Sequence, residues 1–146
     1  MADESGVARE IDAPAADWVA PPPPSSELPR RVDKPWGAEL IWAWTHRYVG
    51  KIITIETGKR LSLQYHERKD EWIHVIDGQL RLTLENDEGT VETRDLGPGE
   101  SVHVPPGRVH RFEAVETCRL VEVSTPELTD VVRLEDDFGR EGTSAP

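Results

Sequence analysis

The sequence predicts an all-β domain folded as a sandwich or barrel, and three observations lead to that prediction. From residue 34 onward, short runs rich in β-branched and aromatic residues are separated by Gly, Pro, Asn and Asp. Leu80, Leu82 and Leu84 alternate with polar residues, which is the period of a strand with one wet face. No long stretch shows the 3.6-residue period of a helix. About nine short strands in a chain of this size are typical of a sandwich or barrel.

The strands are expected at about 38–44, 48–57, 61–66, 71–77, 79–85, 90–95, 101–104, 109–115 and 118–124. Three connections have the residues of tight hairpin turns: Asp77-Gly78, the segment 86–89, and Gly97-Pro98-Gly99. A single short turn is expected over 126–130, because a proline followed by acidic residues is a helix-start pattern.

The chain divides near residue 30. Residues 1–30 are expected to be a disordered Pro-rich arm, since they hold six of the 12 prolines and few apolar side chains. Residues 31–140 are expected to form the folded domain, and 141–146 a frayed C-terminus.

A lone cysteine, Cys118, requires no oxidising compartment. The acidic N-terminus lacks the pattern of a signal peptide, so a cytoplasmic location is expected.

The charge balance narrows the classes of partner. The chain of 146 residues has 17 Lys and Arg against 28 Asp and Glu, a formal net charge of −11. Such a surface repels phosphate backbones and anionic lipids, so the sequence argues against nucleic-acid and membrane partners. A local basic pocket for a small anionic molecule remains compatible with it.

Two strand–turn–strand units carry residues with metal-ligand chemistry. Gln64 and His66 lie two residues apart on an expected strand and therefore share a face. Glu71 begins the next strand and shares a face with the apolar residues at 73 and 75. In the second unit His110 shares a face with Phe112, which makes that face the interior one.

These units resemble the two sequence motifs of the cupin superfamily, G-x5-HxH-x3-4-E-x6-G and G-x5-PxG-x2-H-x3-N. The matching residues are Gly58, His66, Glu71, Gly78, Gly99, Pro105, Gly107 and His110. Two positions depart from the motifs: Gln64 replaces the first His, and Ala114 the closing Asn. The resemblance implies a cupin barrel, that is, a double-stranded β-helix or jelly roll.

The likeness extends over residues 32–140 to the cupin domain of type II mannose-6-phosphate isomerases. The stretches that carry it are 32–37, 58–66, 104–111 and 131–140, including Leu-Ser-Leu-Gln-x-His. In that family the domain commonly follows a mannose-1-phosphate guanylyltransferase domain, for which this chain is too short. The sequence is therefore interpreted as a stand-alone version of the cupin domain.

The resemblance implies a divalent metal held by Gln64, His66, Glu71 and His110. Two imidazoles, a carboxylate and an amide oxygen make a mixed nitrogen and oxygen site. The resemblance favours zinc, while Fe, Mn, Co or Ni also fit such ligands. The alternative is a cupin that has lost its metal, with both histidines hydrogen-bonded in the core.

The implied activity is aldose–ketose isomerisation of a sugar phosphate through an enediol, which needs a Lewis acid and a base. The candidates for proton transfer are Lys51 and Glu122. A phosphate needs cationic groups, for which the candidates are Lys34, Arg60, Arg133 and Arg140. Arg60 is the preferred one because Gln64 and His66 follow it on the same expected strand. His103 is a further candidate for the pocket wall, and Trp36 or Trp72 are either sugar platforms or core and dimer contacts.

Two other functions stay open from the sequence. One is a different metallocupin enzyme of small-molecule biosynthesis, such as an oxygenase, cyclase or epimerase. The other is a non-catalytic cupin that binds a sugar or sugar nucleotide. A homodimer is expected in each case, because small barrels with exposed edge strands usually pair.

Overall fold

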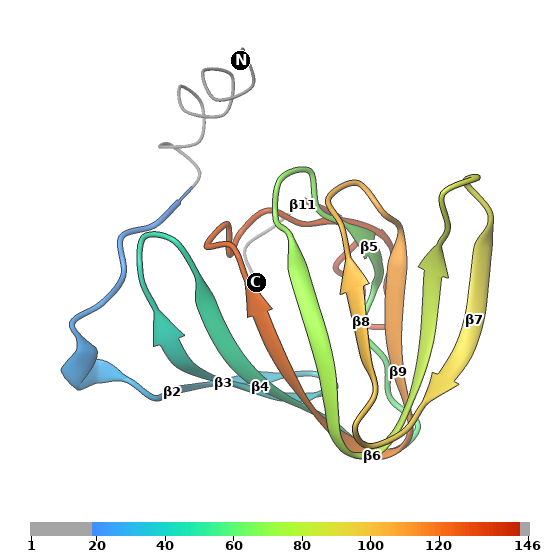
Figure 1. Cartoon of the computed structure of the whole chain (residues 1–146), viewed down its shortest axis with the longest axis horizontal. Helices are drawn as coiled ribbons and strands as arrows, with labels where there is room; N and C mark the ends of the chain where they lie inside the picture. The colour runs from blue at the N-terminus through green and yellow to red at the C-terminus, as the bar shows by residue number, and fades with distance from the viewer. Residues whose placement is uncertain (1–18, 144–146) are drawn as a thin grey trace.

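The computed structural model describes residues 19–143 and shows strands that curl into a barrel (Figure 1). A short 3-10 helix, η2 (Ser25–Glu27), precedes the strands. The strands are β2 (Arg30–Lys34), β3 (Gly37–Trp44), β4 (Val49–Ile55), β5 (Leu63–Tyr65), β6 (Glu71–Glu85), β7 (Val91–Leu96), β8 (Ser101–Val104), β9 (His110–Ser124), β10 (Val132–Glu135) and β11 (Gly142–Thr143). The all-β prediction is confirmed.

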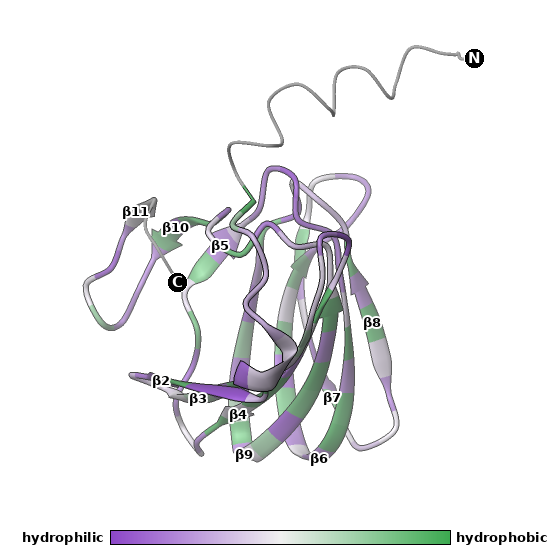
Figure 2. Cartoon of the chain, turned by 90° about the vertical axis from the view of Figure 1, so that its left-hand side faces the viewer, coloured by the Kyte–Doolittle hydropathy of each residue, from purple (hydrophilic) through white to green (hydrophobic). Residues whose placement is uncertain are grey.

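Strand β9 lies at the centre of the topology. It pairs with β4 and β5 on one side and with β6 along most of its length on the other. From β4 the sheet continues through β3 to β2, and from β5 it continues through β10 to β11. Strand β6 also pairs with β7 and β8. Alternating hydrophobic and hydrophilic residues along β6 and β9 give each strand an inner and an outer face (Figure 2).

Two pairs of expected strands are each one long, bent strand. The Asp77-Gly78 pair is not a hairpin turn, as the sequence had indicated, but an irregularity at which β6 bends and continues to pair with β9. Gly78 has a φ of +79°, and a Cβ there would lie 2.1 Å from the carbonyl oxygen of Thr117 on β9. The bend therefore requires glycine. The hairpin expected at 97–99 is also wrong, since β7 and β8 both pair with β6 instead of each other.

Three short strands were not predicted from the sequence. Strand β2 pairs with β3, β10 pairs with β5, and β11 pairs with β10, so two residues of the segment expected to be frayed are paired. Of the expected arm, residues 1–18 lie outside the described residues, and 19–29 include η2. No helix within residues 19–143 has the length and apolar character needed to cross a bilayer.

The barrel interior has two zones. The apolar zone surrounds the bends of β6 and β9, and its fully buried side chains include Ile55, Leu80, Leu82, Cys118 and Leu120. The charged zone lies at the ends of the same strands. Its buried residues are Glu39, Lys51, His66, Lys69, Glu71, His110, Glu122 and Arg133.

Candidate metal centre and adjoining cavity

Three buried side chains converge in the charged zone. His66 follows β5 directly, Glu71 is the first residue of β6, and His110 is the first residue of β9. Each offers one ligand atom, and these atoms all lie within 4.8 Å of one another. The Nε2 atoms of His66 and His110 lie 2.9 and 3.5 Å from Oε2 of Glu71. The strand ends thus bring three of the four expected metal ligands together.

The hydrogen bonds of the two imidazoles point their Nε2 atoms at this centre. Nδ1 of His66 lies 2.6 Å from the carbonyl oxygen of Asp130, and Nδ1 of His110 lies 2.9 Å from that of Arg108. A carbonyl can only accept, so each Nδ1 carries a proton, and Nε2 is the ring nitrogen that faces the centre. Burial lowers the pKa of His110 to about 4, which keeps it neutral near pH 7.

The converging atoms lack hydrogen-bond partners. Nε2 of both imidazoles and Oε2 of Glu71 are buried and accept no hydrogen bond of normal geometry. Buried polar atoms in folded proteins are otherwise nearly always paired. Two imidazoles and a carboxylate aimed at one point fit a divalent metal ion better than they fit plain packing.

Gln64 is a neighbour of this triad. It lies on β5 directly opposite His110, and its side chain lines the same cavity. Its Oε1 accepts a hydrogen bond from the hydroxyl of Ser62 at 2.5 Å. The structure therefore brings Gln64 to the site, while its role as a fourth ligand stays a prediction.

Lys69 is the counter-ion of two buried carboxylates beside the triad. Its ammonium lies 3.0 Å from Oε2 of Glu122 and 3.7 Å from Oε1 of Glu71. Burial opposes the charge of Lys69, but the two carboxylates outweigh it and raise its pKa. Burial also opposes ionisation of Glu71, yet the charge of Lys69 holds its pKa well below the usual range. Burial and the charge of Glu71 raise the pKa of Glu122.

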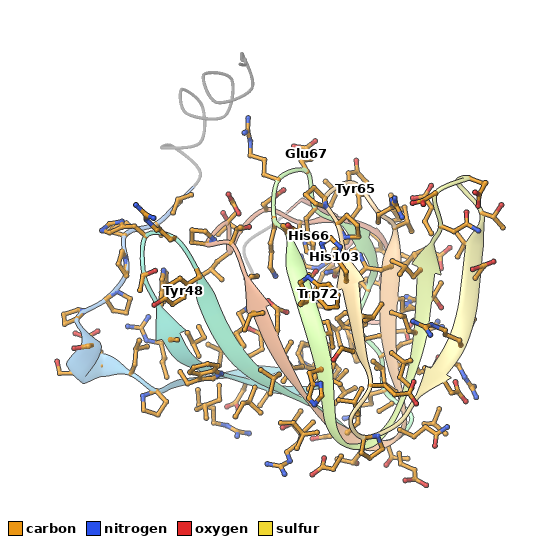
Figure 3. The ribbon with its side chains drawn as sticks, in the orientation of Figure 1. Tyr48, Tyr65, His66, Glu67, Trp72 and His103 are labelled. Carbon is orange, nitrogen blue, oxygen red and sulfur yellow. The ribbon has the colours of Figure 1, made fainter. Side chains whose placement is uncertain are left out.

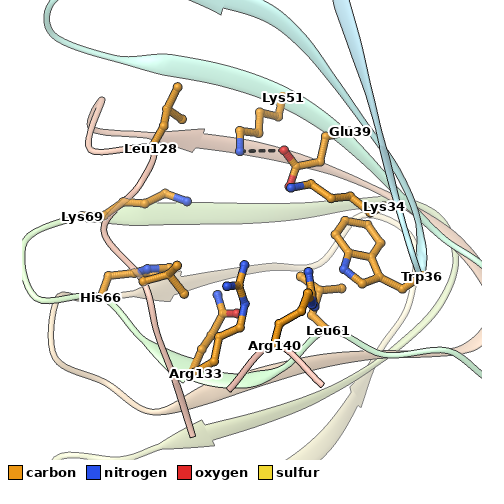
Figure 4. A pocket seen from close by; sticks show the side chains of 12 residues that line it. Lys34, Trp36, Glu39, Lys51, Leu61, His66, Lys69, Leu128, Arg133 and Arg140 are labelled. Carbon is orange, nitrogen blue, oxygen red and sulfur yellow. Dashed lines mark hydrogen bonds and ion pairs between the residues drawn. The ribbon is translucent and has the colours of Figure 1, made fainter. Parts of the chain in front are cut away.

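A cavity of about 60 Å³ adjoins the triad (Figure 4). The side chains of Lys51, Lys69, Arg133 and Arg140 point into it, from β4, the loop before β6, and the C-terminal part of the domain. The complete lining is Lys34, Trp36, Glu39, Lys51, Leu61, Gln64, His66, Lys69, Leu128, Val131, Arg133 and Arg140. Four of these residues come from the segment 126–143, so that segment forms one wall.

The cavity is rich in positive charge. Nζ of Lys51 lies 2.9 Å from Oε1 of Glu39, and Arg140 makes two hydrogen bonds to the carboxylate of Asp136 at 2.8 and 3.1 Å. Burial and the charges of the other cations lower the pKa of Lys34, although Glu39 opposes the shift. A site that already crowds cations together favours an anionic ligand.

Several sequence candidates lie away from the cavity. Arg60 lies outside β5 and binds Asp137 through two hydrogen bonds at 2.8 and 3.0 Å. His103 stacks on Trp72 with ring centroids 5.0 Å apart, and its Nε2 lies 2.7 Å from Asp70 (Figure 3). Trp72 is 51% exposed on the outer face. Of the two tryptophans considered as sugar platforms, the structure brings only Trp36 to the cavity.

The structure also separates the two proton-transfer candidates. Lys51 lines the cavity, while Glu122 is buried behind it as the counter-ion of Lys69. Sequence reasoning did not single out Glu39, Lys69 or Asp130. Glu39 lies two residues before Ile41, so the period of a strand puts both side chains on one face, and that shared face is the available signal that Glu39 points inward.

Comparison with known proteins settles the family. The model of the cupin domain matches residues 51–124 of this chain. The chain belongs to the cupin family. This cupin also shares its fold with KdgF from Halomonas sp., at a TM-score of 0.59 and 24% identity over 66% of this chain and 86% of that one. Oxalate decarboxylase from Bacillus subtilis at pH 4.6 gives a TM-score of 0.64 at 19% identity, over 74% of this cupin and 30% of that chain.

The relatives by sequence are longer proteins. The cupin is 37% identical over 117 residues to mannose-1-phosphate guanylyltransferase ManC of Salmonella typhimurium, covering 76% of this chain and 23% of that protein. Xanthan biosynthesis protein XanB of Xanthomonas campestris is 34% identical, over 76% of this chain and 24% of its own length. Alginate biosynthesis protein AlgA of Pseudomonas aeruginosa is 32% identical, over 75% of this chain and 23% of its own length. The cupin thus spans about a quarter of these relatives, and the expected relation to the guanylyltransferases is confirmed.

Proposed function

We propose that this cupin is a metal-dependent isomerase that interconverts an aldose phosphate and a ketose phosphate. The observation that carries the proposal is that Nε2 of His66, Nε2 of His110 and Oε2 of Glu71 converge without hydrogen bonds beside a cavity lined with cations. The relation to mannose-1-phosphate guanylyltransferases makes mannose 6-phosphate the first substrate to test.

The metal would be held by the triad, with Gln64 as the proposed fourth ligand. Zinc is the proposed ion, and Fe, Mn, Co or Ni also suit the ligand set. When bound, a divalent ion supplies a Lewis acid for the substrate oxygens. The burial of all three triad residues keeps bulk water away from that point.

Lys34, Arg133 and Arg140 are proposed to bind the phosphate group. Together with Lys51 and Lys69 they put five cations in the cavity lining, which holds one carboxylate, that of Glu39. This surplus of positive charge suits a phosphate monoester, which carries close to two negative charges at neutral pH. Arginine adds the paired donors that phosphate oxygens accept.

Lys51 and its partner Glu39 are proposed to move the proton. The charges of Lys51 and Lys34 outweigh burial and lower the pKa of Glu39, so its carboxylate is ionised and able to accept a proton from the sugar carbon next to the carbonyl. The ammonium of Lys51 donates a proton to the carbonyl oxygen, which gives the enediol. Glu39 then returns its proton to the former carbonyl carbon while neutral Lys51 takes the proton of the other enediol hydroxyl, so both side chains end in their starting states. Glu122 serves as the counter-ion of Lys69.

The size of the cavity requires a movement on binding. A volume of about 60 Å³ is far below the several hundred Å³ usual for sites that hold a whole small molecule. The segment 126–143 forms a wall of the cavity and joins the barrel through the short strand β10, so it is the part proposed to open.

The test is turnover of mannose 6-phosphate and fructose 6-phosphate by zinc-loaded protein, with chelated protein as the blank. His66→Ala and Lys51→Met are expected to abolish turnover, and Arg133→Ala to raise KM at least tenfold. Arg119→Ala is the matched control, because that exposed arginine pairs with Asp77 on the outer surface. Absence of turnover by metal-loaded protein on a panel of hexose and pentose phosphates would overturn the proposal.

A non-catalytic cupin that binds a sugar or sugar nucleotide is the second candidate. The small cavity favours it, because that cavity has no room for substrate and reacting groups without movement. Saturable binding without any product distinguishes it from the isomerase. Oxygenase, cyclase or epimerase chemistry, the homodimer and the cytoplasmic location stay predictions.

A further inference from the structure

We infer that Asp130 is a positioning residue that holds the metal ligand His66 and the loop 67–69 in place. The inference rests on the proposed metal site. Asp130 lies in the connection between β9 and β10, more than 60 residues from His66 in the sequence, and is 3% exposed. Its hydrogen bond to His66 connects it to the triad.

The backbone of Asp130 fixes the imidazole. Its carbonyl oxygen accepts the Nδ1 proton of His66 at 2.6 Å, which selects the tautomer whose Nε2 points at Glu71. The carbonyl oxygen of His66 in turn accepts the N–H of Gly107 at 2.6 Å. Main chain and ring of His66 are therefore held from two sides. A partner on the far nitrogen of a ligating histidine also raises its basicity.

The carboxylate of Asp130 fixes the loop that leads to the next ligand. It accepts the N–H groups of Glu67, Arg68 and Lys69 at 3.0, 2.6 and 2.9 Å. This loop connects His66 to Glu71, so its shape sets the distance between two triad residues. Without the carboxylate, three successive N–H groups lose their acceptor, and the N–H of the buried Lys69 is the one least able to find water in its place.

The same residue links the metal centre to the cavity wall. Leu128 and Val131, which flank Asp130, both line the cavity, and Arg133 follows on β10. An ion that orders His66 therefore also orders the segment 126–133, and anything that pulls this segment outward loosens His66. Such a coupling is reciprocal by thermodynamic necessity.

The first test compares zinc affinity in two variants by competition with a chromophoric chelator. Asp130→Asn is expected to bind zinc about 10- to 100-fold more weakly than the wild type. Asp77→Asn is the matched control, because the Asp77 carboxylate also accepts a backbone N–H, from Arg119 at 3.2 Å, but lies on the outer surface. The control is expected to keep wild-type zinc affinity. A visible spectrum of bound cobalt that changes only in Asp130→Asn would add a direct sign of altered ligand geometry.

The second test needs no variant, so it holds even where Asp130→Asn fails to fold. Hydrogen exchange of the wild-type chain is measured with and without zinc. Zinc is expected to slow exchange at residues 67–69 and 127–131, and not at the amides of β7. Zinc binding that leaves these segments unchanged, or Asp130→Asn with wild-type affinity, overturns the inference while the metal site stands. A wild-type chain that binds no metal overturns both.

Discussion

The middle parts of β6 and β9 turn apolar side chains into the barrel interior, whereas the ends of the same strands turn charged side chains into it. Around the bends the inward side chains are apolar and fully buried, as in Leu80, Leu82 and Cys118. At the strand ends the inward side chains are Glu71, His110 and Glu122. Burying apolar surface stabilises the fold, whereas burying charge costs free energy unless each charge is paired. The apolar zone thus supports a charged zone that is held together by its own ion pairs.

The largest expected effect tests that pairing. Lys69→Met removes the ammonium between Glu71 and Glu122, so two buried carboxylates lose their counter-ion. The metal-free protein is expected to lose about 3–5 kcal/mol of unfolding free energy, measured by urea denaturation with a chelator present. Lys59→Met is the control, because Lys59 is exposed and pairs with Glu56, and a loss of at most about 1 kcal/mol is expected there. Equal losses in both variants would contradict the comparison.

The next effect belongs to the apolar zone. Leu82→Ala leaves a cavity at a position with no solvent exposure and is expected to cost about 2–5 kcal/mol. Leu84→Ala, two residues on along the same face and only partly buried, is expected to cost less. Metal bound per mole of folded protein is expected to stay at the wild-type level in both. Loss of metal in Leu82→Ala would show that the two zones are not separable.

A smaller effect is a dependence of stability on pH. The pKa of Glu39 is lowered in the folded state, so its contribution to stability is present above its ordinary value of 4.5 and is lost as pH falls through the lowered pKa. Glu39→Gln is expected to flatten that part of the curve of unfolding free energy against pH below about 4.5. Thermal melts of both proteins from pH 3 to pH 7 give the measurement. If the stability of Glu39→Gln changed with pH in parallel with that of the wild type, the charges of Lys51 and Lys34 would not act on Glu39.

The smallest effect on stability lies on the outer face. Trp72 and Val123 are directly paired across β6 and β9, and they are 51% and 46% exposed. We propose that this apolar row contributes to the expected homodimer. Trp72→Ser is expected to change stability by no more than about 0.5 kcal/mol while weakening association in sedimentation velocity. Val91→Ser, equally exposed on β7, is the control. A wild-type chain that is monomeric at all concentrations would dispose of the dimer.

Most of the fold was readable from local patterns, and the errors have local causes. Alternation at Leu80, Leu82 and Leu84 and the turn at 86–89 located β6 and its hairpin with β7. Gly78 signals a turn in the sequence because glycine adopts positive φ freely, yet here the same property allows a strand to bend. Strands β10 and β11 are too short to show a period, and partners distant in sequence define them.

Some residues of the candidate site could be predicted from the sequence, and others could not. The spacing of the two motifs predicted the convergence of His66, Glu71 and His110, which the structure shows. Lys69 and Asp130 were missed because a charged residue in a loop gives no sign of burial. Glu122, which lies nearest to the Lys69 ammonium, is 53 residues away, and His66 is 64 residues from Asp130. Arg60 was expected at the cavity because it is close to Gln64 in the sequence, but that closeness does not show which way its side chain points. The structure turns its side chain to Asp137.

The pairing of β10 with β5 has a consequence for synthesis of the chain. It joins residues 132–135 to residues 63–65, so the charged zone receives its last wall only when nearly all of the domain has left the ribosome. Until then His66 lacks the carbonyl of Asp130 and the loop 67–69 lacks its acceptor. Closing so long a loop is slow compared with forming a hairpin. Metal capture by the nascent chain is therefore expected to be a late event, following barrel closure and not guiding it.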